Sequence, residues 1–184
     1  VGFNSGLSVT SGQNNTFLGG LSSDALTTGN NNTALGMLTL STDTQGSQNV
    51  AVGYGTLGSQ NFTSATNSAN TGVGYQAGGA ITTGIQNTLM GGASGDVLTD
   101  ADYNTAIGYQ ALSADTKGNR TTAIGYNALA SQNFTSSTDT FNTAVGMSAG
   151  QNNVTGLQNT YLGYGAGIAA VTSYNTAVGY NALG

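Results

Sequence analysis

The side chains best suited to chemistry are three aspartates, Asp96, Asp100 and Asp102, which stand close together in the sequence. Paired carboxylates can hydrolyse a glycosidic bond, one acting as the acid and the other as the base or nucleophile. Carboxylate oxygens are also the ligands that Ca²⁺ prefers. The chain contains no His and no Cys, so the commonest general base and the strongest nucleophile are both missing.

Two features weigh against either role for this stretch. Asp96 has a counterpart at Asp24, whereas Asp100 and Asp102 do not recur. The stretch also lacks the glycine-rich nonapeptide pattern of calcium-binding β-rolls. We therefore interpret these aspartates as part of a solvated loop. We predict a protein with no enzymatic activity, no catalytic residue, no metal and no cofactor.

Binding of phosphate, nucleic acid or membrane is equally poorly supported. The pairs Gly78-Gly79 and Gly91-Gly92 precede no recognisable helix and carry no Lys, so they are typical of turns. The only bases are Lys117 and Arg120, which we expect to balance the charge of nearby Asp115, whereas nucleic acids and anionic membranes require basic clusters. No apolar run approaches the roughly 20 residues of a membrane span. We expect neither a nucleic-acid partner nor membrane insertion.

The composition is far from that of an average globular domain. Charged residues make up 5% of the chain, against roughly 25% as a rule. There are 30 Gly and no Pro, yet 38% of the residues are apolar and they recur at fixed positions. A disordered chain has no reason to keep such a pattern, so we expect an ordered fold.

An internal repeat organises the whole sequence. Residues 104–112 (NTAIGYQAL) are nearly copied by residues 175–183 (NTAVGYNAL). The glycine of this unit recurs with a period of 17 in the numbering, except that every fourth step is 21 and the last is 16, so a second period of 72 appears. The recurring glycines are Gly2, Gly19, Gly36, Gly53, Gly74, Gly91, Gly108, Gly125, Gly146, Gly163 and Gly179.

Each unit predicts a short strand, of about five or six residues, because its β-branched content is high and it is too short for a helix. A 17-residue cycle is too short for a propeller blade and contains no helix, so we expect the strands to stack in parallel as a coil, about 4.8 Å apart. Strand alternation places Thr105 and Ile107 on one face and Ala106 on the other. We expect the Thr and aliphatic rows to face the core.

Stacked coils bring equivalent residues into ladders. Asn side chains can hydrogen-bond along such a ladder, and a Gly at every equivalent site indicates a sharp bend or a close backbone approach. Thr121 is the single break in the Asn row. The predicted ladder residues include Asn32, Asn49, Asn104, Asn142, Asn175, Gly36, Gly53, Gly108, Gly146 and Gly179.

The fold class that follows is all-β: a parallel β-solenoid or β-roll of about eleven 17-residue coils, with every fourth coil lengthened to 21. We expect one repeat domain over residues 1–184, with four-coil blocks at 2–73 and 74–145 and a partial block at 146–184. The sequence opens at Val1, partway through a repeat, so we expect a fragment of a longer protein.

Self-association is expected because a narrow coil leaves apolar rows without cover. A Tyr row and a Leu group would form a larger exposed apolar patch than a monomer usually tolerates. A threefold bundle that shares a central core would bury both, and a single-chain solenoid is the alternative. The Leu group consists of Leu40, Leu57, Leu112, Leu129 and Leu183.

The two four-residue extensions are the candidate contact loops. They carry Asn61 and Phe62 in the first block and Asn133 and Phe134 in the second. They are expected to project from one face, about 19 Å apart along the rod. Exposed aromatic residues on loops are typical of contact surfaces. The alternative is that both Phe rings fold back over the rod or pack at a subunit contact.

The repeat resembles two related groups of proteins. Residues 104–108 (NTAIG) are similar to the Ser-Val-Ala-Ile-Gly core of trimeric autotransporter adhesin heads. The longer unit resembles the Asn-Thr-Ala-Val-Gly-Tyr-x-Ala-Leu repeats of phage tail-fibre-like proteins. The resemblance covers all the units and implies a left-handed parallel β-roll, assembled as a homotrimer on a virion or cell surface. The units here are longer than adhesin head repeats, and Thr usually replaces Val.

The leading hypothesis is a non-enzymatic extracellular fibre segment, such as a tail-fibre shaft or a surface adhesin, that supports attachment to a host cell or surface. Its partners would be further copies of itself and a cell-surface receptor or glycan. A second hypothesis is an ice- or surface-binding solenoid, since flat ladders of Thr and Asn can order water. The predicted inward-facing Thr row disfavours it. A third is a filament in which subunits stack end to end.

Overall fold

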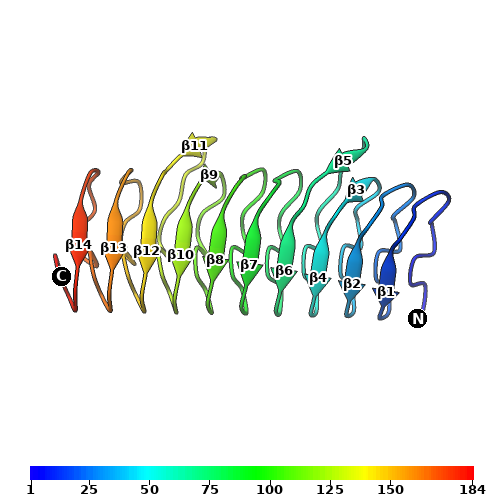
Figure 1. The fold of residues 1–184 in the computed structure, drawn as a ribbon, viewed down its shortest axis with the longest axis horizontal. Coiled ribbons are helices and arrows are strands. Elements are labelled where there is room, and N and C mark those ends of the chain that lie inside the picture. Colours follow the sequence, from blue (N-terminus) through cyan, green and yellow to red (C-terminus); the bar gives the residue numbers. More distant parts are fainter.

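A computed structural model describes all of residues 1–184 as a single rod of stacked coils without any helix. Figure 1 shows the coils following one another from the N-terminus to the C-terminus, each with one strand on the same side. The predicted all-β parallel solenoid is therefore confirmed. Since the chain has no helix, it has none that could cross a membrane.

Ten three-residue strands form one continuous sheet along the rod. They are shorter than predicted because the recurring glycine directly follows each strand and bends the chain away. The first unit, around Gly2, contributes no strand. The strands are β1 (Thr16–Leu18), β2 (Thr33–Leu35), β4 (Val50–Val52), β6 (Thr71–Val73), β7 (Thr88–Met90), β8 (Thr105–Ile107), β10 (Thr122–Ile124), β12 (Thr143–Val145), β13 (Thr160–Leu162) and β14 (Thr176–Val178).

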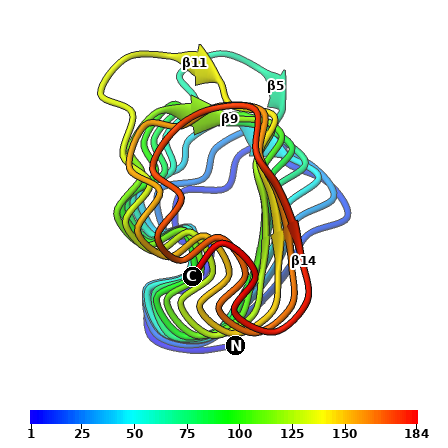
Figure 2. The same ribbon diagram turned by 90° about the vertical axis from the view of Figure 1, so that its left-hand side faces the viewer.

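The register between coils is that of the repeat. In the pair β8 and β10, Thr105 lies opposite Thr122 and Ile107 lies opposite Ile124, with the strands parallel. The other neighbours in the sheet pair in the same way. Viewed along the rod, the superimposed strands form one side of the coil (Figure 2). Every row in the sequence is therefore a continuous row along the rod, and successive coils are slightly rotated relative to one another (Figure 2).

The orientation of the strands is the reverse of the prediction. Ala106 is fully buried, whereas Thr105 and Ile107 on either side of it are partly exposed. The same holds in β10 and β12. The middle residue of each strand faces the interior, and the Thr and aliphatic rows face outward. The expectation that Thr105 and Ile107 point into the core was wrong.

The Leu group explains this orientation. Leu40, Leu57, Leu112 and Leu129 are completely buried in the interior of the single chain, and only Leu183 in the last coil is exposed. Each of these Leu residues, four positions after the recurring glycine, fills the interior space in front of the small Ala of the strand. The expectation that the Leu group needs cover from another chain was therefore also wrong, since the chain buries these side chains itself.

Three strands carry a large residue, Phe17, Leu89 or Tyr161, in place of the inward Ala. Around Leu89, the positions equivalent to the buried Leu are glycines. A Cβ on Gly78 would lie 2.6 Å from Leu89 Cδ1, and one on Gly95 would lie 2.9 Å from Leu89 Cδ2. In most coils a small Ala of the strand faces a Leu, and in these coils a large strand residue faces a Gly. The total side-chain volume of the interior therefore stays similar, as close packing requires.

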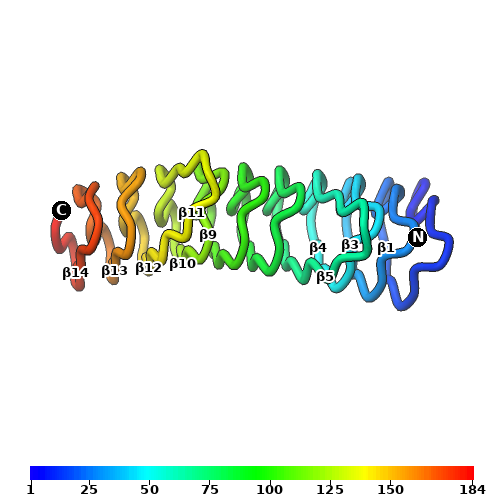
Figure 3. Tube along the Cα trace, turned by 90° about the horizontal axis from the view of Figure 1, so that it is seen from above, coloured from blue at the N-terminus to red at the C-terminus, as the bar shows by residue number.

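Two longer coils carry small flaps. These lie on the side of the rod away from the bend at the recurring glycines, which we call the glycine corner. In the first flap (residues 62–67), β5 (Thr66–Asn67) pairs with β3 (Gly46–Ser47). In the second flap (residues 134–139), β11 (Thr138–Asp139) pairs with β9 (Gly118–Asn119). Both rise from the same side of the rod (Figures 1 and 2). Seen from above, they lie across neighbouring coils (Figure 3).

Candidate functional surfaces

The asparagine row ties each coil to the next through the backbone. The Asn104 N–H donates to Asn87 Oδ1 at 2.9 Å, and Asn104 Oδ1 accepts from the Thr121 N–H at 2.9 Å. Asn104 Nδ2 also donates to the Gly118 carbonyl at 2.8 Å. Side chains bond directly to each other at only some steps, such as Asn49 to Asn32 at 3.1 Å. The row is a structural clamp rather than a binding surface.

The recurring glycines form a second row with no room for a side chain. Gly108 has φ of 133°, and a Cβ there would lie 2.5 Å from the Gly125 carbonyl oxygen. Both the left-handed backbone and the contact with the next coil therefore require glycine. The same conformation occurs at Gly36, Gly53, Gly146 and Gly179.

A buried aspartate anchors each flap. The Asp115 carboxylate accepts hydrogen bonds from the Gly118 N–H at 3.1 Å and the Phe134 N–H at 2.9 Å. Asp43, also fully buried, accepts equivalent bonds from Gly46 at 3.0 Å and Phe62 at 3.1 Å. Sequence reasoning assigned Asp115 to charge balance with the two bases. Its recurrence at Asp43, three residues before a glycine in both blocks, was the available signal for a turn anchor.

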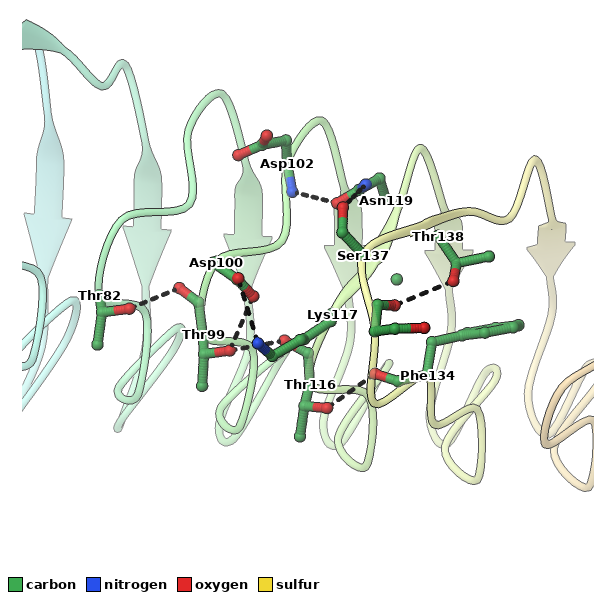
Figure 4. A network of polar contacts seen from close by, with 12 residues as sticks. Thr82, Thr99, Asp100, Asp102, Thr116, Lys117, Asn119, Phe134, Ser137 and Thr138 are labelled. Atoms are coloured by element: carbon green, nitrogen blue, oxygen red, sulfur yellow. Dashed lines mark hydrogen bonds and ion pairs between the residues drawn. The ribbon is translucent and has the colours of Figure 1, made fainter.

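Sequence reasoning also missed a threonine row that leads to each flap; Figure 4 shows the row that leads to the second flap. Thr82 Oγ1 donates to the Thr99 carbonyl at 3.2 Å, and Thr99 Oγ1 donates to the Thr116 carbonyl at 3.1 Å. Thr116 Oγ1 then donates to the Phe134 carbonyl at 2.8 Å. The regular spacing of these threonines, one per coil, was visible in the sequence. These bonds hold the base of the second flap against the rod.

The four predicted contact residues divide into two pairs. Asn61 and Asn133 are exposed. Phe62 is only 7% exposed, and Phe134 is partly buried. The rings therefore lie against the rod, as the alternative interpretation expected, and the polar flap residues are presented to solvent instead.

The three aspartates considered for chemistry do not meet. Asp100 pairs with Lys117 at 3.3 Å, while Asp102 accepts a bond from the Ile85 N–H at 2.8 Å. Burial raises the pKa of Asp102 and of Asp96 above their usual values. The structure contains no group of three or more acidic side chains close enough to hold a metal ion.

The remaining base joins a small charged cluster beside the second flap. Arg120 Nε lies 3.0 Å from Asp139 Oδ2, and the Arg120 guanidinium lies 4.7 Å from the centroid of the Tyr103 ring. One block earlier, the positions of Arg120, Asp139 and Tyr103 are occupied by Gln48, Asn67 and Asn31, which are neutral. Both ion pairs are solvent-exposed, so each contributes little to stability.

The outer face of the long sheet carries two continuous rows. One is the threonine at the start of every strand except β4, which begins with Val50. The other is the aliphatic residue at the end of every strand. Leu18, Met90, Leu162 and Val178 of this second row are among the exposed large hydrophobic residues.

A row of large side chains follows directly after the recurring glycines. Its tyrosines stack in pairs along the rod, with ring centroids 5.6 Å apart in Tyr54 and Tyr75 and 5.8 Å apart in Tyr109 and Tyr126. All of its members apart from the glycines Gly20 and Gly92 are large and exposed. They are Phe3, Met37, Tyr54, Tyr75, Tyr109, Tyr126, Met147, Tyr164 and Tyr180.

A groove of about 420 Å³ runs across four successive coils of the first two blocks. Its lining includes Gly55, Gly58, Gly79, Tyr54 and Gln76. No strand residue lines it, so it opens away from the outer face of the sheet.

Comparison of the sequence with models of protein families, with curated proteins and with solved structures finds no match. The architecture itself places the chain among parallel β-solenoids with a turn of about 17 residues.

Proposed function

We propose that the chain is a non-enzymatic segment of an extracellular fibre, of the tail-fibre-shaft or surface-adhesin kind, that supports attachment to a host cell or surface. The single observation that carries this proposal is the pair of apolar rows, aliphatic and aromatic, that runs along the rod. Such a long exposed apolar stripe is typical of an interaction surface. The resemblance of the repeat to fibre and adhesin proteins adds the location on a virion or cell surface.

The bonding between coils supports a mechanical role. The chain has 106 backbone hydrogen bonds, and only 20 of them lie within the strands. Most others join a turn of one coil to the same turn of the next, for example the Gly108 N–H to the Met90 carbonyl at 2.7 Å. All sides of the coil are tied to its neighbours, so bending in any direction must stretch hydrogen bonds.

Within this proposal, three copies associate through the outer face of the sheet. The aliphatic row supplies apolar area along the rod, and the in-register Thr row is small enough to allow close approach. The Leu group plays no part, because it is already buried. The Tyr row, one residue beyond the bend, lies at the rim of such an interface.

Sedimentation equilibrium tests the association. We expect the mass of three copies for the wild-type chain and for a Val154→Lys, Val171→Lys control, which adds the same two charges at exposed sites outside the sheet. The double variant Ile107→Lys, Ile124→Lys places two charges on the outer face and should yield monomers with unchanged circular dichroism. A stable monomeric wild type would contradict the trimer.

The outward Thr row favours a second candidate, an ice- or surface-binding solenoid. The argument against it was that these threonines point inward, and they do not. Thr88, Thr105 and Thr122 lie in register on consecutive strands, which gives a regular array of hydroxyl and methyl groups on the outer face of the sheet.

Thermal hysteresis and ice shaping test this candidate directly. This candidate, which needs the outer face free of other copies, requires activity in the wild type, its loss in Thr105→Tyr, and its retention in Thr135→Tyr, which changes an exposed threonine of the second flap. A wild type with neither thermal hysteresis nor ice shaping removes the candidate.

A further inference from the structure

The groove over Gly55, Gly58 and Gly79 is absent from the equivalent part of the second block. One block further along the chain, these positions hold Asn127, Ala130 and Gln151. The other two hollows on the surface lie at the two ends of the rod. The repeat therefore provides its own comparison: one copy of the same scaffold is open and the other is filled.

The difference lies in side chains and not in the backbone. Gly55 has φ of 63° and Asn127 has φ of 54°, so both adopt the same left-handed conformation. A Cβ on Gly55 would meet only Gln76 Cγ, at 3.5 Å, which is an ordinary contact. Unlike Gly108, Gly55 is not required by packing. The scaffold tolerates a side chain here, and its absence leaves the groove open.

The lining offers a mixture of groups without a positive charge. Ser41 and Ser59 have hydroxyls that both donate and accept, Gln76 has an amide, and Asp96 has a carboxylate. Tyr54 adds an aromatic ring with an apolar face and a polar tip. The volume of about 420 Å³ is within the range of roughly 300–1,000 Å³ for small-molecule sites.

We propose that this groove binds a neutral saccharide. A sugar presents hydroxyls that both donate and accept, together with apolar C–H faces that can lie on Tyr54. Both bases are engaged in ion pairs on the second-flap side, so nothing in the groove attracts a phosphate, sulfate or sialic acid. This inference rests on the proposed attachment function and names the class of ligand that the fibre would hold.

Asp96 lines the groove and has an unsatisfied carboxylate oxygen. Its Oδ1 atom is buried and has no hydrogen-bond partner, so a rotation of the side chain that turns this oxygen into the groove would let a sugar hydroxyl donate to it. Asp24, the equivalent aspartate, also has an unpaired Oδ1, but no groove adjoins it. The unpaired oxygen thus belongs to this position of the repeat, and only at Asp96 does a hollow give a ligand access to that side chain.

The groove stays accessible in the association proposed above. Its lining residues follow the bend after each strand, and none belongs to the sheet. Trimer formation through the outer face of the sheet would therefore place only Tyr54 of this lining beside the interface and leave the other lining residues open to a ligand.

Saturation-transfer NMR on the intact chain tests the inference with glucose, galactose, mannose, N-acetylglucosamine, lactose and maltose as probes, and sialic acid as an anionic comparison. We expect at least one neutral sugar to bind, with Kd on the order of 1 mM. The variant Gly55→Asn, Gly79→Gln introduces the side chains that the second block has at these two positions and so fills the groove. It should weaken binding by about tenfold or more.

Tyr54→Ala should weaken binding similarly, whereas Tyr126→Ala removes the equivalent stacked tyrosine outside the groove and should leave binding unchanged. Binding of sialic acid alone, no binding by the wild type, or equal binding by the filled variant overturns the inference. Sedimentation of the same samples separates the two proposals. A trimer without sugar binding contradicts only the saccharide site, and a sugar-binding monomer contradicts only the trimeric assembly.

Discussion

The Asp115 carboxylate accepts a hydrogen bond from Gln132 Nε2 at 2.6 Å. One block earlier, Asp43 and Gln60 form the same contact at 2.6 Å. Both aspartates and both glutamines are fully buried, and each aspartate also receives two backbone N–H groups. A buried charge is stabilised here by three donors from two coils, and those donors include the first residue of the flap. The flap is therefore held by the interior of the rod.

Replacing Asp115 with Ala should loosen the second flap. The Gly118 and Phe134 N–H groups would lose their acceptor, and the Gln132 amide would keep only Thr121 Oγ1. Each buried unsatisfied group costs about 1–3 kcal/mol. We expect faster hydrogen exchange at the Phe134 amide and a lower urea midpoint. Asp115→Asn keeps one acceptor oxygen and should have a smaller effect. Exchange at the wild-type rate in the Ala variant would show that the carboxylate does not anchor the flap.

Gly108→Ala should strongly destabilise the rod. The new Cβ would lie 2.5 Å from the Gly125 carbonyl oxygen, on a backbone with φ of 133°. Strain and overpacking together cost about 3 kcal/mol or more. Gly20→Ala is the matched control, because a Cβ there has no atom within 4 Å, and it should change stability by less than about 0.5 kcal/mol. Equal urea midpoints for the two variants would contradict this.

Leu89→Ala should open a cavity that the coil cannot close, because Gly78 and Gly95 offer no side chains to fill it. We expect a loss of about 2–5 kcal/mol in the free energy of unfolding. Val154→Ala, at an exposed position, should remain within about 0.5 kcal/mol of the wild type. A Leu89→Ala loss no larger than that of Val154→Ala would show that the inward row is not tightly packed.

Asp102→Asn should stabilise the protein at neutral pH and not at low pH. Burial raises the pKa of Asp102 in the folded protein, opposed by the Ile85 N–H and Arg120. The folded protein therefore holds the proton more tightly than the unfolded chain, and stability contributed by this group falls as pH rises from the unfolded to the folded pKa. Asn keeps an acceptor for Ile85.

Melting temperatures of the wild type and Asp102→Asn between pH 7 and pH 4 check this prediction. The difference between them should shrink as the pH falls and the wild-type carboxyl becomes protonated. Asp100 and Asp139 interact with the Asp102 charge, so the difference reports Asp102 together with its effect on these two neighbours, and the more distant aspartates contribute equally to both curves. A difference that stays constant or grows toward acid pH would mean that the folded pKa is not raised.

The sequence predicted the coil because glycine spacing depends only on the period. Each recurring glycine, such as Gly108, packs against the carbonyl group of the equivalent glycine in the next coil. The spacing of these glycines in the sequence is therefore the length of each coil. The same argument could not predict which face of each strand points into the interior. Alternation separates Ala106 from Thr105 and Ile107, but it does not say which face is inside. Hydrophobicity favoured Ile107, and the structure instead places Ala106 against the wall that bears Leu112.

A signal for the correct orientation was nevertheless present. The middle strand residue becomes large only where the position four residues after the recurring glycine becomes small, as with Leu89 and Gly95. Such compensation indicates that the two rows face each other in the interior. The groove could not be predicted in this way, because it depends on glycines that belong to different coils. These glycines become neighbours only when the coils are stacked.

The identical register at every step has a consequence for how this protein can change in length. A cut between two blocks exposes the same strand edge, glycine corner and asparagine clamp as a cut one block away. Unequal recombination that adds or removes one whole four-coil block therefore rejoins matching surfaces and creates no new interface. The rod would lengthen or shorten in whole steps of about 19 Å, with its flaps always returning to the same side.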